Sequence, residues 1–261
     1  KMQRIKIKNI QNKKKKKPIT CLTAYSKTIA EILDKYCDII LVGDSVGMVL
    51  YGMKTTREIK IEQMIAHGKA VKQSSKNSLV VFDMPYKTYF NKIVAYKNAK
   101  KIIKETKCDA VKLEGGVKVA NIIKHLTKKK IPVMGHIGLL PQTSSKYKLK
   151  GKKKIERERI IKDALAVTNA GAFAVVIECV VEDLAKEITN IISIPTIGIG
   201  ASKYCDGQIL VTDDIIGLSN VRPRFVKKYS DLRKIIENSV KKYCADVRER
   251  KFPGAGNVYK F

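Results

Sequence analysis

The residues of this sequence best suited to chemistry are polar side chains that recur where short apolar runs end. These side chains are Asp44, Asp83, Lys112, Glu114, His136 and Glu178. A single aspartate after a strand is often only a turn residue or a helix N-cap. Four carboxylates in apolar contexts are different, because isolated buried charges are costly unless they are paired or bound to a metal. Together they indicate a hard divalent cation such as Mg²⁺, which prefers oxygen ligands and typically takes one or two carboxylates.

The cysteines offer no competing metal site. The chain has six cysteines and no C-x-x-C pair or Cys/His cluster, which argues against structural zinc. Several of them lie in apolar runs, where thiols behave as small hydrophobic groups. This usage predicts a reducing, cytoplasmic environment rather than a disulfide framework.

The elements that must position these residues follow one rhythm, in which an apolar run rich in Ile and Val precedes a turn and an amphipathic stretch. Continuous apolar runs of this kind are typical of strands buried on both faces of a parallel sheet. Seven runs are clear and one is weaker: 19–24, 39–45, 79–85, 110–116, 131–138, 174–180, 194–200 and, weakest, 213–218.

Between the runs, the apolar residues show helical spacing. The predicted helices span residues 26–36, 58–73, 91–106, 118–130, 156–171 and 231–250. Ser26 is the expected N-cap of the first, and Gly171 suits a helix C-cap.

Eight strands alternating with helices predict an α/β fold, a (β/α)₈ TIM barrel. The alternative is an open doubly wound sheet, which usually carries a glycine-rich phosphate loop after its first strand. The turn here reads AYSKT and has no glycine, which favours the barrel. A barrel brings the carboxyl ends of all its strands to one mouth, so the polar residues above would converge there.

We expect a single catalytic domain over residues 1–261. It would include a basic N-terminal segment at 1–17 and a C-terminal helix and tail at 228–261. The N-terminal segment lacks the apolar stretch of a secretory signal, and its basic, acid-free composition leaves a transit peptide open. We favour a solvated tail or a first helix. The basic loop at 144–154 is a candidate lid.

The chain is strongly basic, with a formal net charge of +29. Of its 53 basic residues nine are arginines, and the lysines are spread through nearly every segment. A nucleic-acid-binding protein would concentrate such charge on one face, usually with arginine. The scatter therefore favours a compositional drift, with no specific nucleic-acid partner. No apolar run has the length of a membrane span, so we expect no membrane association.

A set of short motifs resembles the ketopantoate hydroxymethyltransferase family, barrel enzymes related to the phosphoenolpyruvate mutase and isocitrate lyase group. The motifs run in family order: TAYS (23–26), LVGDSVGM (41–48), DMPY (83–86), VKLEGG (111–116), PVMGHIGLLPQ (132–142), IECV (177–180), IPTIGIGA (194–201) and CDGQILV (205–211). Any one of them is weak, but the ordered set is specific. The loop after PQTSS departs from the family because it is shorter and lacks a glycine pair, which puts closure of the pocket in question.

The resemblance implies an activity. The family transfers a hydroxymethyl group from 5,10-methylenetetrahydrofolate to 3-methyl-2-oxobutanoate, through a metal-stabilised enolate. The product is ketopantoate, for pantothenate and coenzyme A biosynthesis. The resemblance also implies Mg²⁺ or another divalent cation, and a homo-oligomer, commonly a decamer. Two other classes stay open: a lyase or mutase of the same barrel group acting on another 2-oxo acid, and a nucleic-acid-binding protein.

The resemblance also assigns roles to individual residues. It makes Glu178 the proton acceptor, which needs the raised pKa that an apolar strand supplies. It places His136 near the substrate, although a histidine with all its hydrogen bonds satisfied in the barrel wall is an equal interpretation. For Glu178 the alternative is an ion pair with Lys112. The implied metal ligands are Asp44, Asp83 and Glu114, and the implied substrate contacts are Asp44, Ser45, Asp83 and Lys112.

Overall fold

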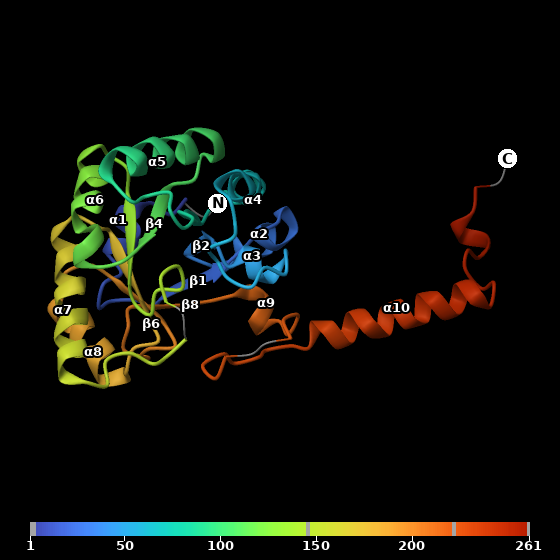
Figure 1. The fold of residues 1–261 in the computed structure, drawn as a ribbon. Coiled ribbons are helices and arrows are strands. Elements are labelled where there is room, and N and C mark those ends of the chain that lie inside the picture. Colours follow the sequence, from blue (N-terminus) through green and yellow to red (C-terminus); the bar gives the residue numbers. More distant parts are fainter. Residues whose placement is uncertain (1–3, 145–146, 221–222, 260–261) are drawn as a thin grey trace. The chain divides into compact units, whose positions relative to one another are not determined.

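A computed structural model describes residues 4–144, 147–220 and 223–259. The chain forms two compact units, Lys1–Val211 and Thr212–Phe261. In the first unit, eight parallel strands close into a barrel in chain order (Figure 1). This confirms the TIM barrel and excludes the open sheet. The strands are β1 (Ile19–Thr23), β2 (Ile39–Val42), β3 (Leu79–Asp83), β4 (Ala110–Glu114), β5 (Val133–Gly138), β6 (Ala174–Glu178), β7 (Thr196–Ile199) and β8 (Gly207–Leu210).

Seven strands lie within the predicted apolar runs, but the prediction of the eighth is wrong. Residues 213–218 contain no strand, and helix α9 (Thr212–Ile215) begins there. Asp213 and Asp214 occupy its first turn, where carboxylates stabilise a helix. The true strand, β8, alternates buried and exposed residues around Gln208. A search for continuous apolar runs therefore passes over it.

The helices lie outside the barrel in Figure 1, with α5 to α8 along one side. Asn91 caps α5 by accepting a hydrogen bond from the backbone N–H of Val94 at 2.9 Å. Gly171 follows α7 with a φ of 89°, the left-handed conformation expected of a residue that ends a helix. The helices of this unit are α1 (Ile7–Gln11), α2 (Lys27–Leu33), α3 (Val46–Val49), α4 (Ile61–Ser74), α5 (Lys92–Thr106), α6 (Val117–Lys128), α7 (Lys154–Asn169) and α8 (Glu182–Ile191). Of these, α3 and α8 were not predicted.

Alternation along each strand separates two cores. Val80 and Phe82 of β3 pack in the larger core, with residues of the surrounding helices, whereas Leu79 and Val81 pack in the core inside the barrel. Side chains two residues apart share one face of a strand, so Asp83 continues the inward series. The strand that presents apolar side chains to the interior thus ends by presenting a carboxylate at the mouth.

The N-terminal segment closes the other end of the barrel. Ile10 of α1 is fully buried among inward residues such as Ile19, Ile39 and Leu79. The segment is therefore a first helix, and its interpretation as a solvated tail is wrong. Three of its cations pair with aspartates that directly precede strands: Arg4 with Asp109, Lys13 with Asp38 and Lys14 with Asp206.

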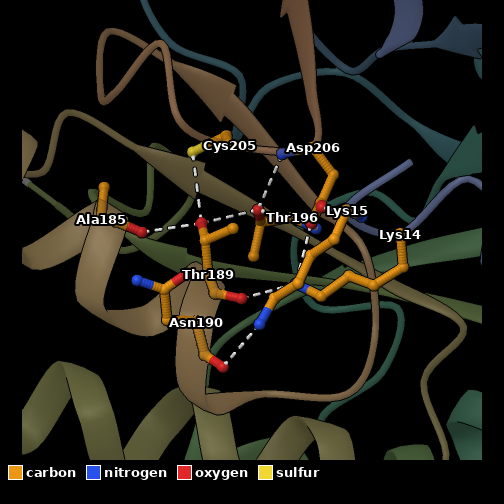
Figure 2. A network of polar contacts seen from close by, with 8 residues as sticks. All are labelled: Lys14, Lys15, Ala185, Thr189, Asn190, Thr196, Cys205 and Asp206. Atoms are coloured by element: carbon orange, nitrogen blue, oxygen red, sulfur yellow. Dashed lines mark hydrogen bonds and ion pairs between the residues drawn. The ribbon is translucent and has the colours of Figure 1, made fainter. Parts of the chain in front are cut away.

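Figure 2 shows the network around one of these aspartates. Asp206 Oδ2 accepts hydrogen bonds from the Thr196 N–H at 2.8 Å and from Lys14 Nζ at 2.9 Å. The Thr196 hydroxyl lies 2.8 Å from that of Thr189 on α8. The network joins the N-terminal segment to β7 and α8, at the barrel end opposite the mouth.

The second unit contains α9, α10 (Leu232–Arg248) and a 3₁₀ helix (Ala255–Asn257). Helix α10 confirms the predicted C-terminal helix. It exposes apolar residues at helical spacing, among them Ile236, Val240 and Tyr243. Across the described residues, no helix has the length and apolar character needed to cross a membrane.

Candidate active site

The barrel brings the predicted polar residues of β3 to β6 together. The registers place Asp83 beside Lys112, Glu114 beside His136 and Gly138 beside Glu178. Lys112 Nζ donates a hydrogen bond to Asp83 Oδ1 at 2.7 Å, and both side chains are buried. Residues far apart in the sequence thus form one charged cluster, as the barrel prediction requires.

His136 lies between Lys112 and Glu178. Its Nδ1 is 3.4 Å from Lys112 Nζ, and its Nε2 is 3.2 Å from Glu178 Oε2. An ammonium group only donates, so Nδ1 is the acceptor and the neutral ring carries its proton on Nε2. Within the described residues, this buried Nε2 has no hydrogen bond of good geometry, which disfavours the interpretation as a satisfied wall histidine.

Asp44 and Glu114 join the cluster through Gln142, which was not among the predicted site residues. Gln142 Nε2 donates to Asp44 Oδ2 at 2.8 Å, and the Gln142 N–H donates to Glu114 Oε2 at 3.0 Å. One feature of the sequence could have indicated a role for Gln142: it is a polar residue within the otherwise largely apolar motif PVMGHIGLLPQ. Its full burial in the structure makes the amide part of the site.

Ser45 lies at the N-terminus of α3, directly after Asp44. Its hydroxyl oxygen is 2.7 Å from the hydroxyl of Tyr25, which follows β1. The Tyr25 carbonyl is in turn 2.6 Å from His67 Nδ1 on α4. Like Gln142, Tyr25 contacts a predicted site residue but was not itself predicted.

Burial and mutual repulsion raise the pKa values of Asp44 and Glu114. Burial raises the pKa of Asp44 well above its ordinary value, and the carboxylates of Asp83 and Glu114 raise it further. Burial also raises the pKa of Glu114 to about 8, against the opposing charge of Lys112. The carboxylates therefore need more positive charge than one lysine supplies.

The groups nearest Glu178 differ in charge. Burial raises the pKa of Glu178 to about 7, and the positive charge of Lys112 opposes this rise. Burial lowers the pKa of His136 well below its ordinary value, and Lys112 lowers it further. The pKa of Lys112 is raised, because the carboxylates, Asp83 foremost, outweigh the effect of burial. A neutral imidazole therefore separates a fixed cation from a carboxyl group that can exchange a proton near neutral pH.

The family model described as "Ketopantoate hydroxymethyltransferase" matches residues 4–255. The chain is 53% identical over 254 residues to the 3-methyl-2-oxobutanoate hydroxymethyltransferase of Pelagibacter ubique (strain HTCC1062), covering 97% of this chain and 99% of the relative. It is 55% identical over 249 residues to the enzyme of the same name from Rhizobium etli, covering 94% and 91%. The chain belongs to the ketopantoate hydroxymethyltransferase family. The predicted family and the predicted class of enzyme, a hydroxymethyltransferase, are confirmed.

Solved structures with the same fold come from the wider barrel group. Phosphonopyruvate hydrolase, in a complex with oxalate and Mg²⁺, superposes with a TM-score of 0.64 at 10% identity, covering 97% of this chain and 93% of that chain. 2,3-Dimethylmalate lyase, of the PEP mutase/isocitrate lyase superfamily, gives 0.61 at 11% identity, covering 95% and 84%. At these identities the likeness confirms the predicted fold group alone.

For a hydroxymethyltransferase of this family, the donor set of the cluster fits a hard divalent cation. Asp44, Asp83 and Glu114 supply only carboxylate oxygens, which suit Mg²⁺. Across the described residues, no three His, Cys, Asp or Glu side chains form a ready-made metal cage. The lack of such a cage is compatible with Mg²⁺, because Mg²⁺ commonly binds one or two carboxylates and completes its coordination shell with water and substrate. The excess of buried carboxylates over cations is the observation that supports the fit.

The predicted lid at 144–154 lies partly outside the described residues, because 145 and 146 are not among them. The described part makes several hydrogen bonds to the rest of the unit. Arg57 Nη2 donates to the Ser144 carbonyl at 2.9 Å, and the Lys150 N–H donates to the Cys179 carbonyl at 2.7 Å, next to Glu178. Closure of this loop over the site stays a prediction.

Proposed function

We propose that the chain transfers a hydroxymethyl group from 5,10-methylenetetrahydrofolate to 3-methyl-2-oxobutanoate and so makes ketopantoate. The relatives at 53% and 55% identity carry the name of this activity. The observation that carries the proposal is the position of Glu178, a carboxyl group with a pKa near 7 across the barrel from Asp44. Strands β2 and β6 are four apart in the ring of eight, so the base and the cation site face one another.

The acidic side of the mouth would bind the oxo acid. Asp44 and Asp83 are the proposed cation ligands, with Glu114 beside them. When bound, the cation supplies Lewis-acid stabilisation of the enolate charge on the 2-oxo group. Lys112 adds a fixed positive charge next to Asp83, where the substrate carboxylate or the developing anion would lie. Ser45, directly after Asp44, offers a hydroxyl to the same substrate.

Glu178 would move the proton. Its carboxylate would take the C3 proton of the oxo acid, and the C–H electron pair would form the new C–C bond to the one-carbon unit. The bonds from this carbon to the two folate nitrogens would break, and water would supply the hydroxyl oxygen. The C3 proton and one proton of the water would end on the folate nitrogens, so that tetrahydrofolate leaves. The alternative, an ion pair with Lys112, has less support, because Lys112 Nζ bonds Asp83 instead. His136 Nε2 lies 3.2 Å from Glu178 Oε2 without a hydrogen bond of good geometry, and a small rotation of either side chain would let its N–H donate to the ionised form of Glu178.

The homo-oligomer implied by the family and the cytoplasmic setting predicted from the cysteines are part of the same proposal. The apolar residues that α10 exposes, Ile236, Val240 and Tyr243, support association, because contiguous apolar patches often mark protein–protein contacts. Sedimentation of the purified chain tests the oligomer. A monomer at micromolar concentration would contradict it.

The direct test is turnover of 3-methyl-2-oxobutanoate with 5,10-methylenetetrahydrofolate and Mg²⁺, with ketopantoate identified by mass. We expect product only when all three are present. A lyase or mutase of the same barrel group would instead convert another 2-oxo acid without folate. No ketopantoate from a folded, Mg²⁺-loaded chain would contradict the proposal.

A further inference from the structure

Gln142 is a fully buried amide at the mouth of the barrel, four residues after β5 ends. Its Nε2 donates to Asp44 Oδ2 at 2.8 Å and to the Met84 carbonyl at 2.9 Å. Its backbone N–H donates to Glu114 Oε2 at 3.0 Å. One residue thus joins the segments that follow β2 and β3 to the carboxylate that ends β4.

The amide has only one orientation that satisfies its neighbours. The Asp44 carboxylate and the Met84 carbonyl accept hydrogen bonds, so the nitrogen must face them. The amide oxygen then faces the Tyr89 hydroxyl, which donates to it. That hydroxyl in turn accepts the Glu114 N–H at 3.3 Å. Every polar atom of this buried side chain has a partner, so rotation of the amide would break several hydrogen bonds at once.

The hydrogen bond from Gln142 engages Oδ2 of Asp44 and does not involve Oδ1. A buried carboxylate without such a donor could turn about its own axis, and either oxygen could then face the mouth. We infer that Gln142 is a positioning residue, which fixes the Asp44 carboxylate so that Oδ1 is the oxygen offered to a divalent cation. The inference rests on the proposed function, because it takes Asp44 to be a ligand. It adds a residue that acts on the ligand and does not touch the cation itself.

Two variants test this. Gln142→Met keeps an unbranched side chain of similar length and removes both hydrogen bonds to acceptors. We expect its affinity for Mn²⁺, measured without substrate by electron paramagnetic resonance of the free ion, to fall about 10–100-fold, as for other residues that orient metal ligands. Tyr89→Phe leaves Gln142 in place and removes only the hydroxyl that orients its amide. It should lose affinity in the same direction, but less.

The matched control is Thr196→Val, which removes a buried hydroxyl at the opposite end of the barrel (Figure 2). It should lower the thermal stability and leave Mn²⁺ affinity unchanged. If Gln142→Met does not fold, Tyr89→Phe decides the question. Wild-type Mn²⁺ affinity in the folded variants, with only stability lost, would overturn the inference alone. If the unaltered chain bound no Mn²⁺, the proposed function would fail as well, and the wild-type titration separates the two results.

Discussion

His136 Nε2 lies 3.2 Å from Glu178 Oε2, across the neighbouring strands β5 and β6. The other ring nitrogen faces the ammonium group of Lys112 at 3.4 Å, which fixes where the imidazole proton lies. The neutral ring therefore places its protonated nitrogen 3.2 Å from the carboxyl group that would act as the base, without a hydrogen bond of good geometry between them. Burial raises the pKa of Glu178 to about 7, and the positive charge of Lys112, on the far side of the ring, opposes this rise.

Asp83→Asn tests the cation site. The substitution keeps the size of the side chain and removes the charge, so Mn²⁺ affinity should fall by more than the roughly 10–100-fold expected for a residue outside the ligand shell. Stability should also fall, because Lys112 loses its ion-pair partner. Asp206→Asn is the matched control, since it removes a buried, lysine-paired carboxylate at the opposite end of the barrel. Equal Mn²⁺ affinity in both variants would contradict the assignment of Asp83.

Stability without divalent cations should fall as the pH rises from about 5 to 8. Folding raises the pKa of Glu178 to about 7 and that of Glu114 to about 8, so the folded chain holds protons that the unfolded chain releases near pH 4.5. Each group then costs up to about 1.4 kcal/mol per pH unit in that window. Under the proposed function Mg²⁺ would bind the ionised carboxylates, so it should raise the melting temperature more at pH 8 than at pH 5.5. Thermal unfolding measures both effects, and equal Mg²⁺ stabilisation at the two pH values would contradict the account.

Lys107 should be replaceable by glycine with a gain in stability. It ends α5 with a φ of 61°, a left-handed conformation that glycine adopts without strain. Lys107→Gly should therefore add about 1 kcal/mol, or roughly 2–4 °C in the melting temperature. Lys104→Gly, within the same helix, should instead cost about 1 kcal/mol. A loss of stability at both positions would contradict this conformation of Lys107.

The net charge of +29 should give only non-specific affinity for nucleic acid. The binding should be weak, independent of sequence and steeply dependent on salt, because it depends on counterion release. Fluorescence anisotropy with two unrelated duplexes at several salt concentrations measures this. Tight binding to one duplex at physiological salt would revive the nucleic-acid-binding alternative.

The sequence predicted the barrel because seven of its strands are continuous apolar runs. It placed Asp83, Glu114 and Glu178 at the strand ends where they lie, and Lys112 within the fourth strand. The eighth strand was misplaced, because Gln208 interrupts its apolar character while Ile215 and Ile216 mimic a strand in a helical region. The polar or apolar character of individual residues cannot distinguish a strand that contains one polar residue from a helical segment that contains adjacent isoleucines. The pairing of β8 with β1 and β7, which does separate them, is a property of the closed sheet.

The contacts between side chains could not be predicted in the same way. Gln142 is 98 residues from Asp44 in sequence, and nothing local marks the hydrogen bond between them. The proton position on His136 likewise depends on which ring nitrogen faces Lys112, and this depends on the orientation of the ring in the packed barrel. The sequence predicted which types of side chain lie at the mouth of the barrel. The hydrogen-bond partners of these side chains depend on how the barrel packs.

The most direct test of the account is exchange of the C3 proton of 3-methyl-2-oxobutanoate with deuterated water, in the presence of Mg²⁺ and without folate. The rate should be followed by proton NMR for the unaltered chain and for Glu178→Gln, which keeps size and hydrogen bonding but removes the base. We expect exchange that needs Mg²⁺, rises with pH up to about 7 as Glu178 ionises, and falls about 10²–10⁴-fold in the variant, with little change in affinity for the oxo acid. Exchange near the unaltered rate in Glu178→Gln would contradict the proposed mechanism and leave the fold and family unaffected.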